Sequence, residues 1–433
     1  MSVVLAYVDA VPGRLYPLVA TLLALAHRGH RVAVRCGIDD VERLRSLGLD
    51  ASPLRREIER FEPDDWRART RFGALSSGLG QFGERARYQL PDLEQAIVAE
   101  QPDVLFVDEG AWGAAAAAEH SGLPWAFSIV SPVPLPSRDA PPFGLGLAPR
   151  HDRLGRLRDR LAKPLTLGTL ERVIASHMNP LRTELGLPPV ATINDVYLAA
   201  SVVLAYTAEP FEYPRSDWPP KLKLVGPGLW EPPADPPDWL DELRQPLVLV
   251  TCSTLFQNDR RLAEVACEAL AGAPYDVVVT TADVDSAGLP TAANVRIERF
   301  LPHVPLLERA ACVVCHAGMG ITQKALAHGV PVVAVPFGRD QPEVARRVEV
   351  AGAGIRLPAR KLRAEPLRRA VRRAMELRPG AERIAAAFAA AGGAVAAADE
   401  IEGLTLGRAP VAVEAAAQGQ RLQKAPSAEV PQS

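Results

Sequence analysis

The chain has 433 residues, of which 49 are basic and 51 acidic, and its formal net charge is −2. This length predicts two to three domains. The charge balance argues against a dedicated nucleic-acid-binding protein, which carries a basic excess. Apolar residues make up 48% of the chain and charged residues 23%, and this composition excludes a wholly disordered protein.

The five cysteines are odd in number and irregularly spaced, so they form no disulfide framework and indicate a reducing compartment. No uninterrupted apolar run reaches about 18 residues, so we expect no membrane span. The apolar stretch Leu18–Ala26 follows the acidic Asp9 rather than a basic segment, which argues against a signal peptide. We therefore expect a cytoplasmic protein.

Strand-like and helical stretches alternate in the first half of the chain. The expected strands are Val3–Val8, Arg31–Cys36, Val104–Val107 and Trp125–Val130. The expected helices are Leu18–Arg28, one starting at Asp39–Asp40, and Trp112–Glu119. Residues 61–90 and 132–170 show no clear strand pattern, and we expect long functional loops there. This alternation predicts a parallel sheet covered by helices on both faces.

The second half repeats the alternation. The expected strands are Leu247–Val250, Asp276–Thr280, Val295–Arg299, Cys312–Cys315 and Val332–Val335. The expected helices are Arg260–Ala271, Met319–His328, Pro342–Val350 and Leu362–Leu377. The sequence thus predicts an α/β protein with two doubly wound, Rossmann-like domains that face each other across a cleft.

Composition places the domain boundaries. We expect the first domain at residues 1–213, a proline-rich linker at 214–240 and the second domain at 241–380. A C-terminal helix is expected at 381–405, interrupted at Gly392–Gly393, and a disordered tail at 406–433.

Cys312–His316 matches the C-x-x-C-H pattern of covalent haem attachment. Residues i and i+3 of a strand point to opposite faces, so Cys312 and Cys315 cannot both bond one porphyrin. We expect two buried core cysteines and no metal site.

A glycine-rich turn follows the same strand and precedes a helix. His316, Gly318 and Gly320 lie there, where glycine permits close backbone approach and the helix N-terminus offers free N–H groups. A histidine beside them can add a hydrogen bond to a phosphate oxygen. The arrangement suits a diphosphate, and a simple glycine turn is the alternative.

Asp340 and Gln341 open a later helix. A carboxylate next to a carboxamide can bind neighbouring sugar hydroxyls, and N-capping is the alternative role.

Together these motifs resemble the donor-binding signature of family-one glycosyltransferases of the GT-B fold. The matching residues include His316, Gly318, Gly320, Gly329–Pro331, Asp340–Gln341, Ala345–Val348 and Gly352–Gly354. The stretches Phe211–Pro214 and Val225–Pro227 also resemble the family. The similarity is greatest to the bacterial group that glycosylates natural products.

The resemblance implies specific roles for these residues. The first domain would bind the acceptor and the second a UDP- or dTDP-sugar, with no cofactor and no metal. His316, Gly318, Gly320, Ser253 and Thr254 would hold the donor diphosphate, and Asp340 and Gln341 the donor hexose. The segment from Leu301 through His303 to Val304 would line the nucleobase side.

One departure from the family lies in the first domain. The family's general-base histidine is replaced by Arg14, whereas its helper aspartate is retained as Asp108. Arginine remains protonated and cannot accept a proton. We hypothesise that Arg14 and Asp108 form an ion pair, and that Asp108, Asp9 or Glu109 serves as the base. Alternatively, the acceptor needs little base assistance, or Arg14 binds an anionic acceptor or the donor phosphates.

The resemblance implies an inverting transfer to a small, apolar or aromatic natural product. Candidate acceptor-pocket residues are Tyr16, Trp66, Trp112 and Phe143, with Phe82 as a further aromatic candidate. A non-catalytic auxiliary protein on the same scaffold and a nucleotide-sugar epimerase or hydrolase are the alternatives. The sequence leaves open whether the chain forms a homodimer.

Overall fold

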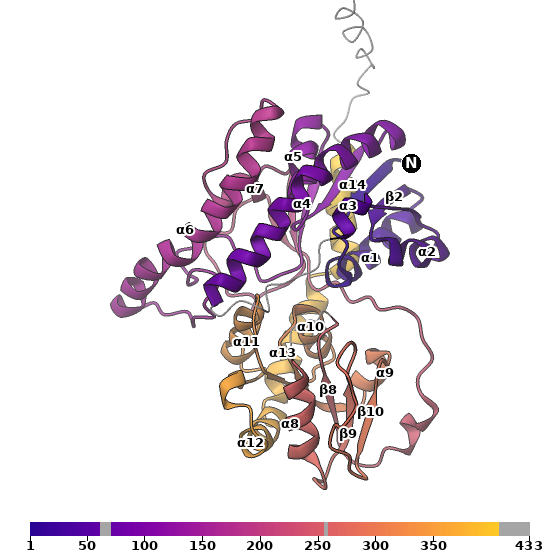
Figure 1. Ribbon diagram of the computed structural model, residues 1–433, viewed down its shortest axis with the longest axis vertical. Helices are drawn as coiled ribbons and strands as arrows, with labels where there is room; N and C mark the ends of the chain where they lie inside the picture. Colours follow the sequence, from indigo (N-terminus) through magenta and orange to yellow (C-terminus); the bar gives the residue numbers. More distant parts are fainter. Residues whose placement is uncertain (61–70, 255–258, 407–433) are drawn as a thin grey trace, which may run out of the picture.

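The protein consists of two parallel sheets, each enclosed by helices and stacked one above the other in Figure 1. The computed structural model describes residues 1–60, 71–254 and 259–406. The predicted pair of doubly wound α/β domains is confirmed. Most of the expected tail, residues 407–433, lies outside the described residues.

The first sheet has seven parallel strands in the order β3-β2-β1-β4-β5-β6-β7. They are β1 (Val3–Tyr7), β2 (Arg31–Cys36), β3 (Asp50–Pro53), β4 (Val104–Asp108), β5 (Trp125–Ile129), β6 (Val202–Ala205) and β7 (Leu222–Leu224). The helices around them are α1 (Pro12–His27), α2 (Ile38–Ser46), α3 (Arg56–Glu59), α4 (Arg71–Glu100), α5 (Trp112–Ser121), α6 (Arg153–Glu184) and α7 (Ile193–Tyr197). The order reverses between β1 and β4, so the loops after these two strands diverge and leave a ligand position between them.

The second sheet has six parallel strands in the order β10-β9-β8-β11-β12-β13. They are β8 (Leu247–Thr251), β9 (Asp276–Thr280), β10 (Val295–Glu298), β11 (Ala310–Cys315), β12 (Val332–Ala334) and β13 (Gly354–Arg356). The helices are α8 (Arg260–Leu270), α9 (His303–Leu307), α10 (Met319–Ala327), α11 (Gln341–Val350), α12 (Ala364–Met375), α13 (Arg378–Ala390) and α14 (Gly393–Leu406), with short 3-10 turns η2 (Asp238–Glu242) and η3 (Ala359–Lys361). Its order reverses between β8 and β11.

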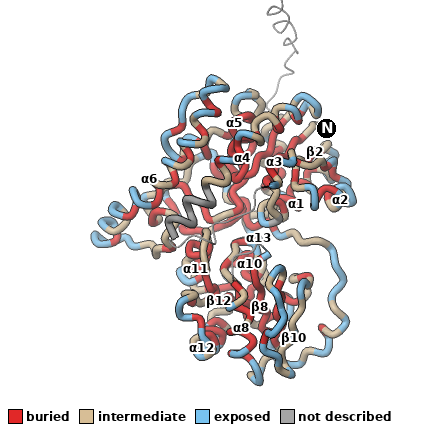
Figure 2. Tube along the Cα trace, viewed as in Figure 1, coloured by how far each residue is buried: buried red, intermediate tan, exposed pale blue. Residues whose placement is uncertain are grey.

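Each sheet is buried on both faces, as Figure 2 shows for the strands. Alternate residues of one strand enter different cores: Leu5 and Tyr7 pack on one side of the first sheet, and Val4 and Ala6 on the other. In the second sheet Cys312 and Cys315 also enter opposite cores, as predicted. Both cysteines are buried, which is incompatible with one shared porphyrin.

Two expected loops are largely helical. Residues 71–100 form α4 and residues 153–184 form α6, which packs against α4. Residues 61–70 lie outside the described part of the chain. The apolar pattern of these helices is weak because each buries only a narrow stripe, including Leu93 on α4 and Ile174 on α6. Tertiary packing supplies the stability that local pattern does not reveal.

Helix α1 begins six residues earlier than the sequence suggests, at Pro12. Proline is favoured in the first turn of a helix because it needs no N–H partner there. Arg14 therefore lies in the first turn of α1, and not in a loop.

The expected linker and C-terminal helix each differ in part from the structure. Within residues 214–240, β7 adds a strand to the edge of the first sheet. The C-terminal helix begins at Arg378, three residues before the expected start. The expected interruption is present, because Gly392 and Gly393 both adopt positive φ, at 86° and 57°, and divide the segment into α13 and α14.

Helices α13 and α14 pack on different domains. Ile384 and Phe388 of α13 enter a core of the second domain, whereas Ala397 and Ile401 of α14 enter a core of the first. No membrane-spanning segment was expected from the sequence. Among the described residues, one helical segment, Arg378–Thr405, is long enough and apolar enough to cross a membrane, by length and composition alone. Its apolar residues instead connect the two domains.

Candidate active site

Arg14 lies in a cluster of carboxylates at the carboxyl ends of β1 and β4. Its Nη1 is 2.6 Å from Oε1 of Glu109 and 3.8 Å from Oδ1 of Asp108. The hypothesised pair with Asp108 is present, but Glu109 is the nearer partner. Burial acts to lower the pKa of Arg14, yet Glu109, Asp108 and Asp9 together raise it. Arg14 is therefore a permanent cation.

Glu109 is held by a full set of donors. Its Oε1 accepts from the amides of Val130 and Ser131, both at 3.1 Å. Its Oε2 accepts from the Ser131 hydroxyl at 3.0 Å and the Tyr197 hydroxyl at 3.4 Å. Glu109 is thus held in place beside Arg14, and these donors occupy both of its oxygens.

Asp108 has fewer hydrogen-bond donors around it than Glu109. Burial, with help from Glu109 and Asp9, raises the pKa of Asp108 to about 7, against the lowering effect of Arg14 and the Gly110 amide. The Gly110 amide donates to Oδ2 at 3.0 Å, whereas Oδ1 is buried and makes no hydrogen bond within the described residues. A carboxylate with a pKa near 7 and an unused oxygen matches what a general base needs at neutral pH.

Three further residues complete this cluster. Asp9 pairs with Arg85 of α4 at 2.6 Å, and both side chains are buried. The ring of Phe82 lies 5.3 Å from the guanidinium carbons of both Arg14 and Arg85. Sequence reasoning named Asp9 and Phe82 but missed Arg85, because no local motif surrounds it.

On the donor side, β8 and β11 are neighbours in the sheet, with Thr251 opposite Cys315. This register brings Ser253, just after β8, beside His316, just after β11. The Ser253 amide donates to Asp259 at 2.8 Å, and Asp259 interacts electrostatically with His316. Thr254 is exposed, and the four residues after it are not described. Asp259 is a site residue that the sequence analysis missed.

His316 is neutral at pH 7, because burial lowers its pKa to about 4 while Asp259 acts to raise it. The main chain of Thr251 lies close to the ring, but Nδ1 is buried and makes no hydrogen bond within the described residues. Gly318 is the N-cap residue of α10, and a Cβ there would lie 2.3 Å from Nε2 of His316. The glycine therefore makes room for the imidazole at the N-terminus of α10, where anions bind.

Asp340 and Gln341 lie at the start of α11. Asp340 occupies the N-cap position but its side chain makes no capping hydrogen bond, so capping does not explain it. Burial and Glu109 raise the pKa of Asp340, and Arg14 lowers it. Oε1 of Gln341 accepts from the amides of Phe337 and Gly338, at 2.8 and 3.1 Å, and holds the turn before α11.

These electrostatic interactions connect the motifs in space. Asp340, from the second domain, lies close enough to Arg14 and Glu109 of the first domain to interact with them electrostatically. Arg339, the residue before it, acts on His316. The predicted sugar-binding and diphosphate-binding motifs thus share one site that faces the carboxylate cluster.

The expected nucleobase segment is tied to the interdomain connection. Glu231 accepts from the amides of His303 and Val304, at 3.3 and 2.9 Å, and pairs with Lys324 of α10 at 3.0 Å. Burial, with Lys324, lowers the pKa of His303 to about 4, and its Nε2 lies 3.3 Å from the Thr280 hydroxyl. The neighbouring Leu301 is half-buried. Glu231 fixes the position of this segment, a role that the sequence did not reveal.

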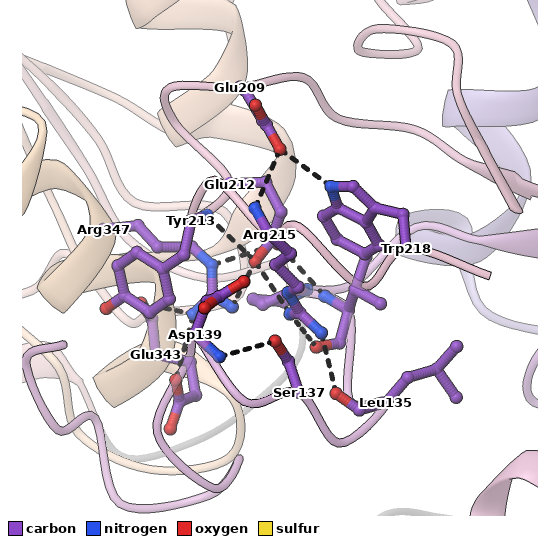
Figure 3. A network of polar contacts seen from close by, with 12 residues as sticks. Leu135, Ser137, Asp139, Glu209, Glu212, Tyr213, Arg215, Trp218, Glu343 and Arg347 are labelled. Atoms are coloured by element: carbon purple, nitrogen blue, oxygen red, sulfur yellow. Dashed lines mark hydrogen bonds and ion pairs between the residues drawn. The ribbon is translucent and has the colours of Figure 1, made fainter. Parts of the chain in front are cut away.

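A buried ionic network, shown in Figure 3, joins the domains beside this site. Arg347 of α11 donates to Glu212 of the first domain at 2.7 and 3.1 Å, and to Glu343 at 2.9 Å. Arg215 also pairs with Glu212, at 3.2 Å. The other oxygen of Glu343 accepts from the amides of Gly144 and Gly146, at 2.8 and 2.7 Å. The network fixes a loop of the first domain to helix α11, which Asp340 precedes.

The acceptor-pocket candidates have different surroundings. Tyr16 contacts Arg43 at 2.6 Å and Trp230 at a ring distance of 5.2 Å, away from the carboxylate cluster. Trp112 is a core residue, 2% exposed, beside Phe82. Phe143 is half-buried and precedes Gly144. Trp66 lies outside the described residues. Elsewhere too, residues 1–60, 71–254 and 259–406 contain no group of three or more His, Cys, Asp or Glu side chains that could hold a metal ion.

Two sequence comparisons show which known proteins this chain resembles. A family model described as "Erythromycin biosynthesis protein CIII-like, C-terminal domain" matches residues 265–401. The 4'-demethylrebeccamycin synthase of Lentzea aerocolonigenes is 35% identical over 409 residues, which cover 90% of this chain and 97% of that protein.

Solved structures share the fold. The calicheamicin glycosyltransferase CalG4 has a TM-score of 0.72 and 22% identity, and the match covers 95% of this chain and all of that one. The glycosyltransferase SsfS6 of Streptomyces sp. SF2575, solved with thymidine diphosphate, has a TM-score of 0.67 and 18% identity, over 93% of this chain and all of that one. From the near full-length relative and the site described above, the chain belongs to the family-one glycosyltransferases of the bacterial natural-product type, which have the GT-B fold.

Proposed function

We propose that the chain transfers a hexose or deoxyhexose, with inversion, from a UDP- or dTDP-sugar to an apolar or aromatic natural-product acceptor. The observation that carries this proposal is the electrostatic interaction of Asp340 with Arg14 and Glu109. This interaction between the two domains supports a site in which the donor sugar at Asp340 meets the acceptor beside Arg14. The relative named for 4'-demethylrebeccamycin and the SsfS6 complex with thymidine diphosphate support the two substrate classes.

The donor diphosphate would lie at the N-terminus of α10. There the neutral His316 can donate one hydrogen bond to a phosphate oxygen, and the helix dipole stabilises the charge that develops on the leaving group. Asp340 and Gln341 would hold the hexose.

The chemical step is a displacement at the anomeric carbon. The acceptor heteroatom forms a bond to that carbon, the bond to the diphosphate oxygen breaks with its electron pair, and the nucleoside diphosphate leaves. Asp108 takes the acceptor proton, because Glu109 is saturated with donors and Arg14 is permanently protonated. Arg14 supplies a fixed positive charge beside Asp108 and orients the substrate.

The pH dependence of turnover tests these roles. Mass spectrometry would follow UDP-glucose and dTDP-glucose with a panel of aromatic aglycones, including the precursor of 4'-demethylrebeccamycin. Asp108 is active as the anion, so kcat/KM should rise with pH through about 7. Asp108→Asn should lower kcat/KM by about 10²–10⁴-fold and abolish that rise.

Asp50→Asn is the matched control, because Asp50 is exposed on β3 and, among the described residues, forms an ion pair only with Arg31. An Asp108→Asn variant with the wild-type rate and pH profile would refute the assignment of the base. Consumption of donor without any acceptor would instead indicate the hydrolase or epimerase alternative.

A further inference from the structure

The N-terminal half of α6, residues 153–165, exposes a row of leucines. Leu154, Leu157, Leu161 and Leu165 are 67%, 54%, 64% and 60% exposed. They recur every three or four residues, so they share one face of the helix. Isolated exposed leucines are ordinary, but a contiguous row of four on one helix marks an interaction surface.

A second row, of basic residues, runs beside the leucines. Arg153, Arg156, Arg160 and Lys163 are exposed and follow nearly the same spacing. Within the described part of the chain none of these four forms an ion pair with a carboxylate. Asp159 is the single acidic residue of this half-helix, and it pairs with Arg158 at 2.7 Å. Residues 153–165 therefore carry a net charge of +4.

The fold does not need this surface. A third face of the helix, including Gly155, Ala162 and Thr166, is buried and attaches α6 to the first domain. Figure 1 shows this half of α6 projecting sideways from the first domain, and Figure 2 shows its exposed chain. The leucines and the basic row are thus presented outward on a helix that is already anchored.

The charge decides which partner fits. In a homodimer formed through this surface, a charge of +4 would face a second charge of +4. A bilayer that contains anionic lipids offers phosphates for the basic row and an acyl boundary for the leucines. We propose that residues 153–165 bind the surface of an anionic lipid bilayer, and that they hold the acceptor domain against it. This proposal does not depend on the transferase mechanism.

Co-sedimentation of the full-length chain with vesicles tests the proposal. Vesicles of phosphatidylcholine alone are compared with vesicles that contain about one third phosphatidylglycerol. Binding should be at least about tenfold stronger to the anionic vesicles and should weaken as salt is raised, since surface charges are screened. The double variants Leu157→Ser/Leu161→Ser and Arg156→Gln/Arg160→Gln should each lower binding by about tenfold or more.

Val98→Ser is the matched control, because Val98 is 72% exposed on α4 and should be replaceable without effect on binding. Circular dichroism confirms that each variant is folded. Wild-type binding by the leucine variant would overturn the proposal. So would a wild-type chain that ignores anionic vesicles. In that case light scattering would measure the oligomeric state of the wild type and of the leucine variant. A wild-type dimer that the leucine substitutions dissociate would identify a self-association surface. A monomeric wild type would indicate that this surface binds another protein.

Discussion

The buried network around Arg347 makes a quantitative prediction about stability. Arg347→Met keeps most of the side-chain volume but removes the hydrogen bonds to Glu212 and Glu343. Both carboxylates are buried, with side chains 0% and 3% exposed. The substitution leaves two buried carboxylates without their shared cation, which is much more costly than losing a surface pair.

The structure sets the size of the effect. Removing one partner of a buried ion pair costs about 3–5 kcal/mol. Glu212 retains Arg215 at 3.2 Å, and Glu343 retains the amides of Gly144 and Gly146. We therefore expect the lower value, about 3 kcal/mol, which for a domain of this size lowers Tm by roughly 6–12 °C.

The effect should also depend on pH. In the native protein, Arg347 and Arg215 outweigh burial and lower the pKa of Glu212, so its contribution to stability is present at neutral pH and is lost on acidification. Without Arg347, burial moves the folded-state pKa of Glu212 upward. The folded variant then binds a proton at Glu212 more readily than the wild type does. The difference in free energy of unfolding between wild type and variant should therefore become smaller as the pH falls from 7.5 towards 5.

Calorimetry and urea unfolding at pH 7.5 and pH 5 measure both effects. Arg373→Met is the matched control, because the Arg373 side chain is 66% exposed and pairs with Glu376 on the surface. That control should change the free energy of unfolding by less than about 0.5 kcal/mol. If Arg347→Met lowered the free energy of unfolding by the same amount at both pH values, the electrostatic explanation would be refuted. A packing defect would then explain the loss of stability.

Two further predictions rest on pairs of glycines. Gly318→Ala should abolish calorimetric binding of thymidine and uridine diphosphates, as His316→Ala should, because the Cβ at residue 318 would displace the imidazole. Gly403→Ala in α14, whose Cβ would meet no neighbouring atom within 4 Å, should retain binding. Equal affinities of the Gly318→Ala and Gly403→Ala variants would contradict this role of His316. Gly113→Ala should destabilise the first domain by at least about 1–3 kcal/mol, because its Cβ would lie 1.9 Å from the Ala86 carbonyl oxygen between α5 and α4. Gly168→Ala in α6 should stabilise it by about 0.5–1 kcal/mol, and urea unfolding of both variants checks the two signs.

Much of the fold was predictable from the sequence because strands in parallel sheets are buried on both faces. Such strands appear as short apolar runs, as in Val3–Tyr7 and Leu247–Thr251. Helix α4 escaped prediction because its buried face includes the polar residues Arg85, Gln89 and Asp92. Helix α6 escaped prediction because the exposed leucines of its N-terminal half disturb its amphipathic pattern. The early start of α1 was not predicted, because a Pro12–Gly13 pair indicates a loop when the sequence is considered without the structure.

The site was predictable where its residues form local motifs. His316, Gly318 and Asp340 are recognised from short spacings, and the structure brings these motifs together. The network of Glu212 and Arg347 was not predictable, because its partners lie 135 residues apart in the chain. Both residues stand in motifs that resemble the family, so the signal was present, but one sequence does not show which side chains pair.

Arg14 is intelligible only together with the carboxylates that surround it. A histidine in its place could be neutral, whereas arginine adds a permanent charge to a site that is largely buried. Glu109 pairs with that charge at 2.6 Å, and four donors occupy its two oxygens. Asp108, at 3.8 Å, is left with a weaker attraction, and burial then sets its pKa near 7. In the mechanism that we propose, Arg14 therefore supplies a positive charge and Asp108 accepts the proton, so two residues share the role that the resemblance assigns to one histidine.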